Sequence, residues 1–313
     1  MPKVAVIGAG QVGSTAAMRL AESGIAEIAL IDVKGDLARA KALDISQALP
    51  LTSSPCKVTG GSDYELAGES EVVVITAGMA RQPGMSRHDL LRSNAKIVRD
   101  VVTSIKDATP DCAIIMVTNP LDEMSYLAWR LTGWKRHRIM GMAGLLDSCR
   151  FASFIADKLE IPPDQVDAIV LGSHGDTMLP LPRLSTVSGT PVTDRLSPEI
   201  LRELEERTRN AGAEIVSLLQ TGSAYYAPSA CIARMAQAIM GDEELQVPAS
   251  VLLDGEYGMR DVFLGVPVTL ARGGWKIVVE LPLLADEQEG LETCANLIRK
   301  RLVELDEWLE GAR

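Results

Sequence analysis

Short apolar runs recur through the first half of the chain, and stretches with helical spacing separate them. We predict strands over these runs, which are Val4–Ile7, Ile28–Ile31, Lys57–Gly60, Glu71–Thr76 and Ala113–Val117. We predict helices over the stretches between them, which are Ser14–Ala21, Gly35–Leu49 and His88–Lys106. Unbroken apolar runs are typical of strands buried on both faces, and strands that alternate with helices favour a doubly wound parallel sheet.

The pattern changes near Gly141. We predict helices over Asp147–Glu160, Ser197–Leu219 and Asp286–Trp308, and one strand over Val166–Leu171. Between Val251 and Leu281, strand-like runs are separated by turns that contain glycine, which indicates an antiparallel sheet. We therefore predict an α/β chain of two domains. Residues 1–143 form a Rossmann-type, doubly wound parallel sheet, and residues 144–313 form an α+β domain with antiparallel strands.

The sequence Gly8-Ala9-Gly10-Gln11-Val12-Gly13 lies between the first predicted strand and the first predicted helix. This G-x-G-x-x-G pattern is typical of dinucleotide binding: Gly8 permits a tight turn, Gly10 lets the backbone approach a pyrophosphate, and Gly13 lets the helix pack on the strand. The helix N-terminus adds N–H groups and partial positive charge that favour an anion. Taken alone, the pattern is also compatible with an ordinary glycine turn.

Asp32 supports the dinucleotide interpretation. It ends the second apolar run, about 20 residues after the glycines, where an acidic side chain binds the ribose hydroxyls of NAD. A carboxylate there repels the 2′-phosphate of NADP, so we predict NAD, although Lys34 is close by. The alternative is that Asp32 is only a turn residue after a strand.

Composition excludes several other classes of protein. The chain has 313 residues, of which 47% are hydrophobic, so it can bury a sizeable core. Its formal net charge of −11 argues against a general nucleic-acid-binding surface, because such a surface needs basic patches. The five cysteines are scattered without a C-x-x-C pair, so we predict neither a metal site nor a disulfide framework. The N-terminus enters a strand directly, and no apolar run approaches the roughly 20 residues of a membrane span. We expect no signal peptide and no membrane contact, which makes the cytoplasm the default location.

Candidate catalytic groups follow predicted strands. His174 lies in Gly172-Ser173-His174-Gly175-Asp176, where backbone and ligand can come close. It is either a proton carrier or an ordinary turn histidine. Asp147 and Arg150 lie one helical turn apart, so they form either an intrahelical ion pair or two separate functional groups on one helix face. In the second case, Arg150 binds a carboxylate of the ligand with its forked guanidinium and Asp147 orients a histidine.

Four motifs, in order and at proper spacing, together resemble the lactate/malate dehydrogenase family over essentially the whole chain. They are Gly8–Gly13, Thr118-Asn119-Pro120-Leu121-Asp122, Leu146-Asp147-Ser148-Cys149-Arg150 and Gly172–Asp176. The loop Met79–Arg87 and the segment Thr221–Tyr226 resemble the malate-specific, lactate-dehydrogenase-like branch of that family. The resemblance implies NAD-dependent oxidation of (S)-malate to oxaloacetate, with a small dicarboxylate as substrate.

The resemblance also implies residue roles. His174 accepts the hydroxyl proton, and Asp147 holds its imidazole and raises its pKa. Arg150 clamps the C1 carboxylate, and Arg87 polarises the C2 carbonyl. Arg81 pairs with the second carboxylate. The remaining implied contacts are Asn119 to the substrate oxygen and the cofactor, and Gly8, Ala9, Gly10, Gln11, Val12, Gly13, Asp32, Asn94, Val117 and Thr118 to the cofactor.

Two alternative functions remain at this point. Lactate dehydrogenases typically carry glutamine where this chain has Arg81, so an L-lactate dehydrogenase acting on pyruvate and lactate is the second candidate. A non-catalytic NAD-binding scaffold on the same fold is the third, although it would have no need of His174, Asp147 and Arg150 together. Family members are dimers or tetramers, and the resemblance favours a homotetramer.

Overall fold

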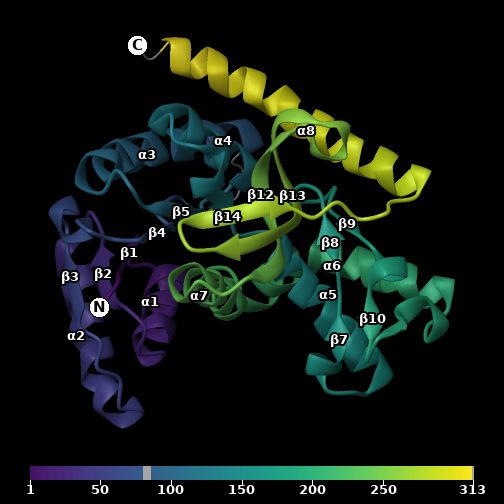
Figure 1. Cartoon of the computed structure of the whole chain (residues 1–313), viewed down its shortest axis with the longest axis horizontal. Coiled ribbons are helices and arrows are strands. Elements are labelled where there is room, and N and C mark those ends of the chain that lie inside the picture. The colour runs from purple at the N-terminus through teal and green to yellow at the C-terminus, as the bar shows by residue number, and fades with distance from the viewer. Residues whose placement is uncertain (80–85, 312–313) are drawn as a thin grey trace.

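The structure is a computed structural model that describes residues 1–79 and 86–311 (Figure 1). In this part of the chain a nine-stranded sheet has the strand order β14-β13-β12-β6-β5-β4-β1-β2-β3. Six strands are parallel: β1 (Lys3–Ile7), β2 (Glu27–Ile31), β3 (Val58–Gly61), β4 (Val72–Ile75), β5 (Ala113–Met116) and β6 (Ile139–Gly141). Their order, with β1 and β4 at the centre, confirms the predicted doubly wound Rossmann arrangement.

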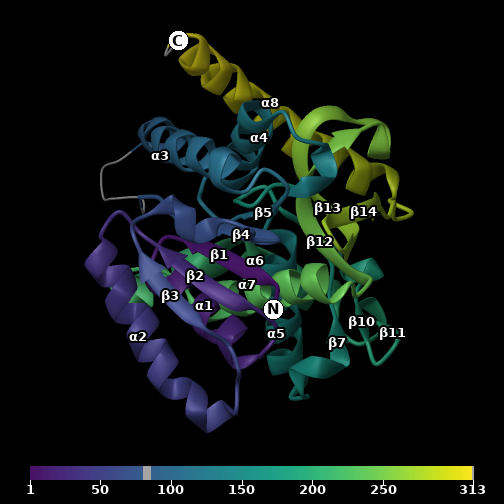
Figure 2. The same ribbon diagram turned by 60° about the vertical axis from the view of Figure 1, so that its left-hand side comes forward.

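Helices cover both faces of the parallel strands. Figure 2 shows α3 (Arg87–Ala108) and α4 (Leu121–Thr132) on one side, and α1 (Gln11–Glu22), α2 (Gly35–Thr52) and α7 (Tyr226–Gly241) on the other. Every residue of β4 and β5 is buried, which explains why these strands have no polar positions inside them. The carboxyl ends of β1, β2, β4 and β5 therefore lead into the loops where a ligand can reach the backbone.

The antiparallel strands extend the same sheet. β12 (Leu245–Asp254), β13 (Arg260–Ala271) and β14 (Gly274–Val278) pair antiparallel, as predicted, and β12 joins β6 where Ser250 lies opposite Gly141. Three helices complete the second half: α5 (Gly144–Leu159), α6 (Pro198–Leu219) and α8 (Ala285–Gly311). The shared sheet means that the second half of the chain is attached to the first half by backbone hydrogen bonds and not only by a linker.

The predicted helices and parallel strands match the structure within three residues, the antiparallel strands begin at Leu245 and not at Val251, and one predicted strand is an error. The single strand over Val166–Leu171 is wrong: the structure has β7 (Val166–Asp167) and β8 (Val170–Leu171) in two different small sheets. Between them the Ile169 N–H donates to the Ser185 hydroxyl, and its carbonyl accepts from Leu181 N–H. These partners lie outside any strand, so the ladder breaks there and the chain changes sheets.

The small sheets and single-turn helices complete the description. The small strands are β9 (Leu179–Pro180), β10 (Thr186–Val187) and β11 (Thr190–Pro191). The 3₁₀ turns are η1 (Tyr64–Ala67), η2 (Arg136–Arg138), η3 (Pro163–Gln165), η4 (Pro182–Leu184), η5 (Val192–Asp194) and η6 (Glu256–Gly258). In the residues described, no helix combines the length and the apolar character that a membrane crossing requires.

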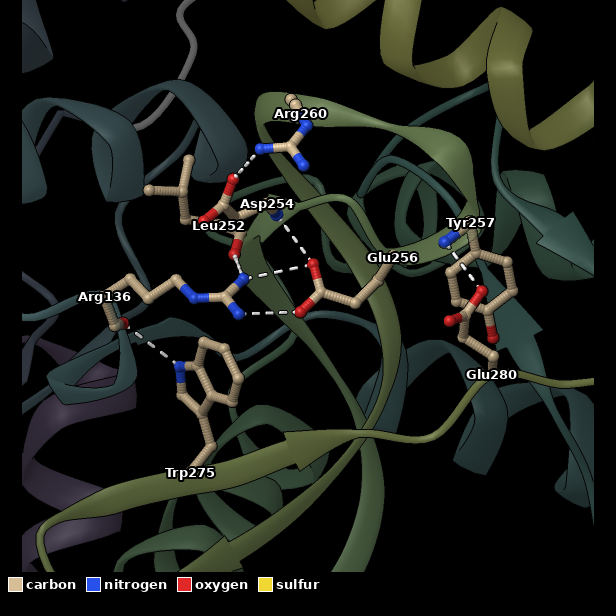
Figure 3. A network of polar contacts seen from close by, with 8 residues as sticks. All are labelled: Arg136, Leu252, Asp254, Glu256, Tyr257, Arg260, Trp275 and Glu280. Atoms are coloured by element: carbon tan, nitrogen blue, oxygen red, sulfur yellow. Dashed lines mark hydrogen bonds and ion pairs between the residues drawn. The ribbon is translucent and has the colours of Figure 1, made fainter.

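A polar network fastens the hairpin of β12 and β13 to η2 (Figure 3). Arg136 makes a two-pronged ion pair with Glu256, with nitrogen–oxygen distances of 2.7 and 3.1 Å, and donates to the Leu252 carbonyl at 2.9 Å. Its guanidinium lies over the Trp275 ring, 5.1 Å from the centroid, and its carbonyl accepts from the indole N–H. The network therefore joins the end of the Rossmann half to β12, to η6 and to β14.

Candidate active site

The glycine turn has the shape that a pyrophosphate requires. Gly8 has φ +108°, and a Cβ there would lie 2.6 Å from the Thr76 hydroxyl oxygen. A Cβ on Gly13 would lie 1.9 Å from the Gly8 carbonyl oxygen, so only glycine allows the first turn of α1 to approach β1. A Cβ on Gly10 would meet nothing within 4 Å, and no side chain caps the helix there. The N-terminus of α1 thus presents open backbone N–H groups that fit an anion.

Asp32 lies directly beside this turn. One carboxylate oxygen accepts from Ala9 N–H at 2.7 Å, and the other accepts from Lys34 N–H at 2.9 Å. Asp32 therefore fixes the glycine turn from the end of β2. A carboxylate oxygen has more than one acceptor position, so these bonds leave room for ribose hydroxyls.

Asn94 joins the ends of β4 and β5. Its amide oxygen accepts from Met79 N–H at 2.7 Å, and its amide nitrogen donates to the carbonyls of Met79 and Asn119. The Thr118 hydroxyl, also buried, donates to the Ala77 carbonyl at 2.8 Å. Asn94 and Thr118 thus hold the segment from Ala77 to Met79 in place, while Val117 is half-buried and Asn119 is exposed. The peptide between Asn119 and Pro120 is cis.

His174, Asp147 and Arg150 meet in one cluster. Nδ1 of His174 lies 2.8 Å from one carboxylate oxygen of Asp147, and Nη1 of Arg150 lies 3.2 Å from the other. The Asp147 side chain is 2% exposed, against 17% for His174 and 13% for Arg150. Asp147 therefore lies deepest in the cluster. The His174 imidazole and the Arg150 guanidinium lie nearer the surface, where a ligand can reach them.

The electrostatics of the cluster favour a protonated imidazole. Burial alone works against the charged form of His174, but the Asp147 carboxylate outweighs it, so the His174 pKa is raised. The Nε of Arg150 is buried and has no hydrogen-bond partner among the residues that the structure describes. A buried, unpaired guanidinium N–H is costly, so this atom fits a ligand carboxylate that would satisfy it.

Asp122 is a residue of the site to which sequence reasoning assigned no role. It is 2% exposed and accepts from the His174 backbone N–H at 3.2 Å and from the Ser250 hydroxyl at 2.7 Å. Burial raises the pKa of its carboxyl group, although both hydrogen bonds favour the carboxylate. Because Asp122 follows Asn119 by three positions, it connects the end of β5 to the histidine loop. Its place in the Thr118–Asp122 motif was the only available signal.

Two predicted arginines are not placed by the structure. Arg81 lies outside the described residues, as do its neighbours in 80–85. Arg87 is the first residue of α3, whose start is fixed by reciprocal hydrogen bonds between Ser86 and Asp89, but its side chain is not described. The described site therefore contains an imidazole, the buried carboxylate that binds it and one guanidinium.

Comparison with known proteins identifies similar families and relatives over nearly the whole chain. Residues 2–141 match a family model described as "lactate/malate dehydrogenase, NAD binding domain", and residues 145–307 match "lactate/malate dehydrogenase, alpha/beta C-terminal domain". A malate dehydrogenase of Trichormus variabilis is 47% identical over 302 residues, which cover 96% of this chain and 93% of the relative.

Solved structures of malate dehydrogenases also superpose closely on this chain. A malate dehydrogenase structure from Salinibacter ruber superposes with a TM-score of 0.95 at 43% identity, covering 99% of this chain and 100% of the other. The apo form of the Picrophilus torridus malate dehydrogenase gives a TM-score of 0.97 at 37% identity, covering 100% and 99%.

Proposed function

The chain belongs to the lactate/malate dehydrogenase family, and on that premise we propose that it is a malate dehydrogenase, an NAD-dependent oxidoreductase that interconverts (S)-malate and oxaloacetate. The observation that carries the proposal is the Asp147 carboxylate, which binds His174 on one side and Arg150 on the other. Such a cluster holds a proton donor beside a binding group for an acid, which is what a 2-hydroxy or 2-keto acid requires.

The proton moves at Nε2 of His174, since Nδ1 is engaged by Asp147. Neutral His174 takes the proton of the malate hydroxyl, and protonated His174 returns it to oxaloacetate in the reverse direction. Asp147 fixes the imidazole orientation and stabilises the imidazolium. NAD, when bound, supplies the acceptor for the hydride from C2 of malate.

Charge pairing selects and holds the substrate. Arg150 binds the C1 carboxylate with its free Nε, and Asn119 and Arg87 contact the C2 oxygen, where Arg87 stabilises developing negative charge. Arg81 pairs with the second carboxylate of oxaloacetate. Pyruvate has a methyl group there and would leave the guanidinium unmatched, which disfavours the lactate dehydrogenase alternative.

The cofactor contacts follow from the turn and the strand ends. The anion site is the N-terminus of α1, with Gly8, Ala9, Gly10, Gln11, Val12 and Gly13, and it suits the pyrophosphate of NAD. Asp32 favours the ribose of NAD over that of NADP, because a 2′-phosphate would lie against its carboxylate. Asn94, Val117, Thr118 and Asn119 complete the cofactor side.

The remaining expectations extend the proposal. Residues 1–143 bind the dinucleotide, and residues 144–313 supply the substrate and proton-transfer groups. The enzyme is a cytoplasmic homotetramer, with a dimer as the alternative. Exposed leucines on α2 and α6, among them Leu43, Leu51 and Leu218, support self-association, which light scattering measures directly.

The deciding experiment is a substrate panel with purified protein. With NADH we expect kcat/KM for oxaloacetate to exceed that for pyruvate at least about 100-fold, and NADPH to serve poorly. Faster turnover of pyruvate would favour a lactate dehydrogenase instead. His174→Asn is expected to bind NADH and lose turnover; if a histidine variant left every measurable function intact, the non-catalytic interpretation would hold.

A further inference from the structure

Two carboxylates lie next to each other in the first turn of α4, beside the histidine cluster. Asp122 is 2% exposed and Glu123 is 1% exposed. Burial of two adjacent acids is costly unless hydrogen-bond donors or cations compensate it. Asp122 accepts from the His174 N–H and from the Ser250 hydroxyl, so it is held by donors of the site itself. A cation for Glu123 comes from the far end of the chain.

Arg301 of α8 supplies that cation. Its Nε lies 2.5 Å from one Glu123 carboxylate oxygen, and its side chain is half-buried where α8 packs against α4 and β13 (Figure 1). The same charge acts on the neighbouring acid. Burial, the largest effect, raises the pKa of Asp122, and among the charged groups around it His174 and Arg301 oppose the rise. Arg301 therefore balances the first turn of α4 from across a helix–helix interface.

The same helix also contacts the histidine loop, residues 172–178. Cys294 lies about two helical turns before Arg301, so both side chains point to the same side of α8. The Cys294 thiol donates to the Thr177 carbonyl at 2.7 Å, and a Cβ on Gly172 would lie 2.8 Å from the Cys294 sulfur. One face of α8 thus reaches both ends of the loop directly, and it reaches the middle of the loop by way of α4.

We propose that Arg301 is a positioning residue of the active site, which fixes the first turn of α4 through Glu123 and thereby fixes the backbone of His174 through Asp122. If the charge of Arg301 is removed, the Glu123 carboxylate gains by turning toward water. Because it is 1% exposed, it reaches water only if that turn of α4 rotates. The rotation carries Asp122 away from the His174 N–H. The effect on turnover rests on the proposed function, whereas the effect on the His174 backbone does not.

The charge of Glu123, and not its volume, is what makes Arg301 necessary. A buried carboxylate that has lost its cation takes up a proton as the pH falls, and the neutral acid is tolerated in the interior. The harm done by loss of Arg301 should therefore grow as the pH rises, and it should disappear when Glu123 is also made neutral. A residue that only packs α8 against α4 would show neither property.

The first test measures kcat and KM for oxaloacetate and NADH with the purified, assembled enzyme. Relative to the wild type, Arg301→Met should lower kcat about tenfold at about pH 8 and less at about pH 6, with the KM for NADH unchanged. Adding Glu123→Gln to Arg301→Met should return kcat to within about threefold of the wild type at both pH values, because no buried charge remains. Lys300→Met, the matched control at the exposed neighbouring position, should behave as the wild type does.

The second test follows His174 without turnover. The chain has three histidines, so incorporation of ¹⁵N-labelled histidine gives three backbone amide signals, and the one that is absent from His174→Asn belongs to His174. We expect this signal to move in Arg301→Met and to return in the double variant. Arg301→Lys keeps the charge, folds more readily and loses the planar fork, so its signal should move part of the way and its kcat should fall about two- to threefold.

Several outcomes overturn the proposal. They are a His174 amide signal that moves in neither Arg301 variant, a kcat that does not change in Arg301→Met, an equal loss in the double variant, a loss that does not depend on pH, or an equal loss in Lys300→Met. A wild-type chain that reduces neither keto acid, with the amide signal moving as expected in the variants, would contradict the proposed function and leave the positioning role standing.

Discussion

Nδ1 of His174 lies 2.8 Å from a carboxylate oxygen of Asp147, although 27 positions separate the two residues in the sequence. The carboxylate is almost completely buried, so little water competes for the imidazole. One ring nitrogen is thereby committed to Asp147, and the other is left for the substrate. The pairing determines both the orientation of His174 and the pH range over which it carries a proton.

Asp147→Asn is therefore expected to move the pH profile. In the proposed mechanism, reduction of oxaloacetate needs protonated His174, and the raised pKa of His174 keeps that form present to higher pH. Without the carboxylate the pKa falls, so the high-pH limb of kcat/KM should move to lower pH. The rate at the optimum should fall at least about 100-fold. An unmoved limb would show that Asp147 does not control the imidazole.

Arg81→Gln tests the substrate specificity proposed for Arg81. Loss of the guanidinium leaves the second carboxylate of oxaloacetate unpaired, so kcat/KM for oxaloacetate should fall at least about 100-fold while that for pyruvate does not fall. Arg92→Gln removes the same charge from an exposed position on α3 and serves as the control. An unchanged ratio of oxaloacetate to pyruvate rates would assign the selectivity to another residue.

Asp122→Asn tests a positioning residue. The amide has one acceptor oxygen where the carboxylate has two, so either the His174 N–H or the Ser250 hydroxyl faces an NH2 group and loses its acceptor. We expect kcat for oxaloacetate to fall about tenfold with the KM for NADH unchanged. Ser250→Ala removes one donor but leaves the bond to His174, so its kcat should stay close to wild type. Equal losses in the two variants would indicate a general packing defect.

The sequence predicted best what depends on local backbone chemistry. The glycine turn is an example, because Gly8 and Gly13 are required by a φ of +108° and by a contact that no Cβ could make. Asp147 and Arg150 were another, since helical spacing alone places them on one face. The roles of His174 and Asp147 came from the resemblance, because spacing does not show which distant residues meet.

What the sequence did not predict depends on distant partners. Asp122 accepts hydrogen bonds from residues 52 and 128 positions away, so the residues next to it in the sequence give no indication of this network. The stretch Val166–Leu171 looks like one strand, yet hydrogen bonds from Ile169 to the segment around Ser185 divide it. β6 has only three residues, too few for a periodic signal, although it joins the two halves of the sheet.

Glu256→Gln is expected to weaken the attachment of the β12–β13 hairpin. Partial burial is the largest single effect and opposes ionisation, but the two-pronged bond from Arg136 and the backbone N–H bonds from Asp254 and Glu256 together outweigh it and lower the Glu256 pKa from 4.5 to about 2. The amide keeps the shape and loses the charge, so the free energy of unfolding at pH 7 should fall by about 1 to 2 kcal/mol. Denaturant titration of both proteins measures the difference.

The pH dependence of that difference identifies its cause. A carboxylate whose pKa is depressed in the folded state contributes stability above its unfolded value, and that contribution is lost as the pH falls toward the folded value. The gap between wild type and Glu256→Gln should therefore be constant above about pH 4.5 and close as the pH falls to about 2. Asp254→Asn is the control: it removes the exposed ion pair with Arg260 in the same hairpin and should change stability little. A gap that persisted in acid would assign the loss to packing, because protonation would already have removed the ion pair with Arg136.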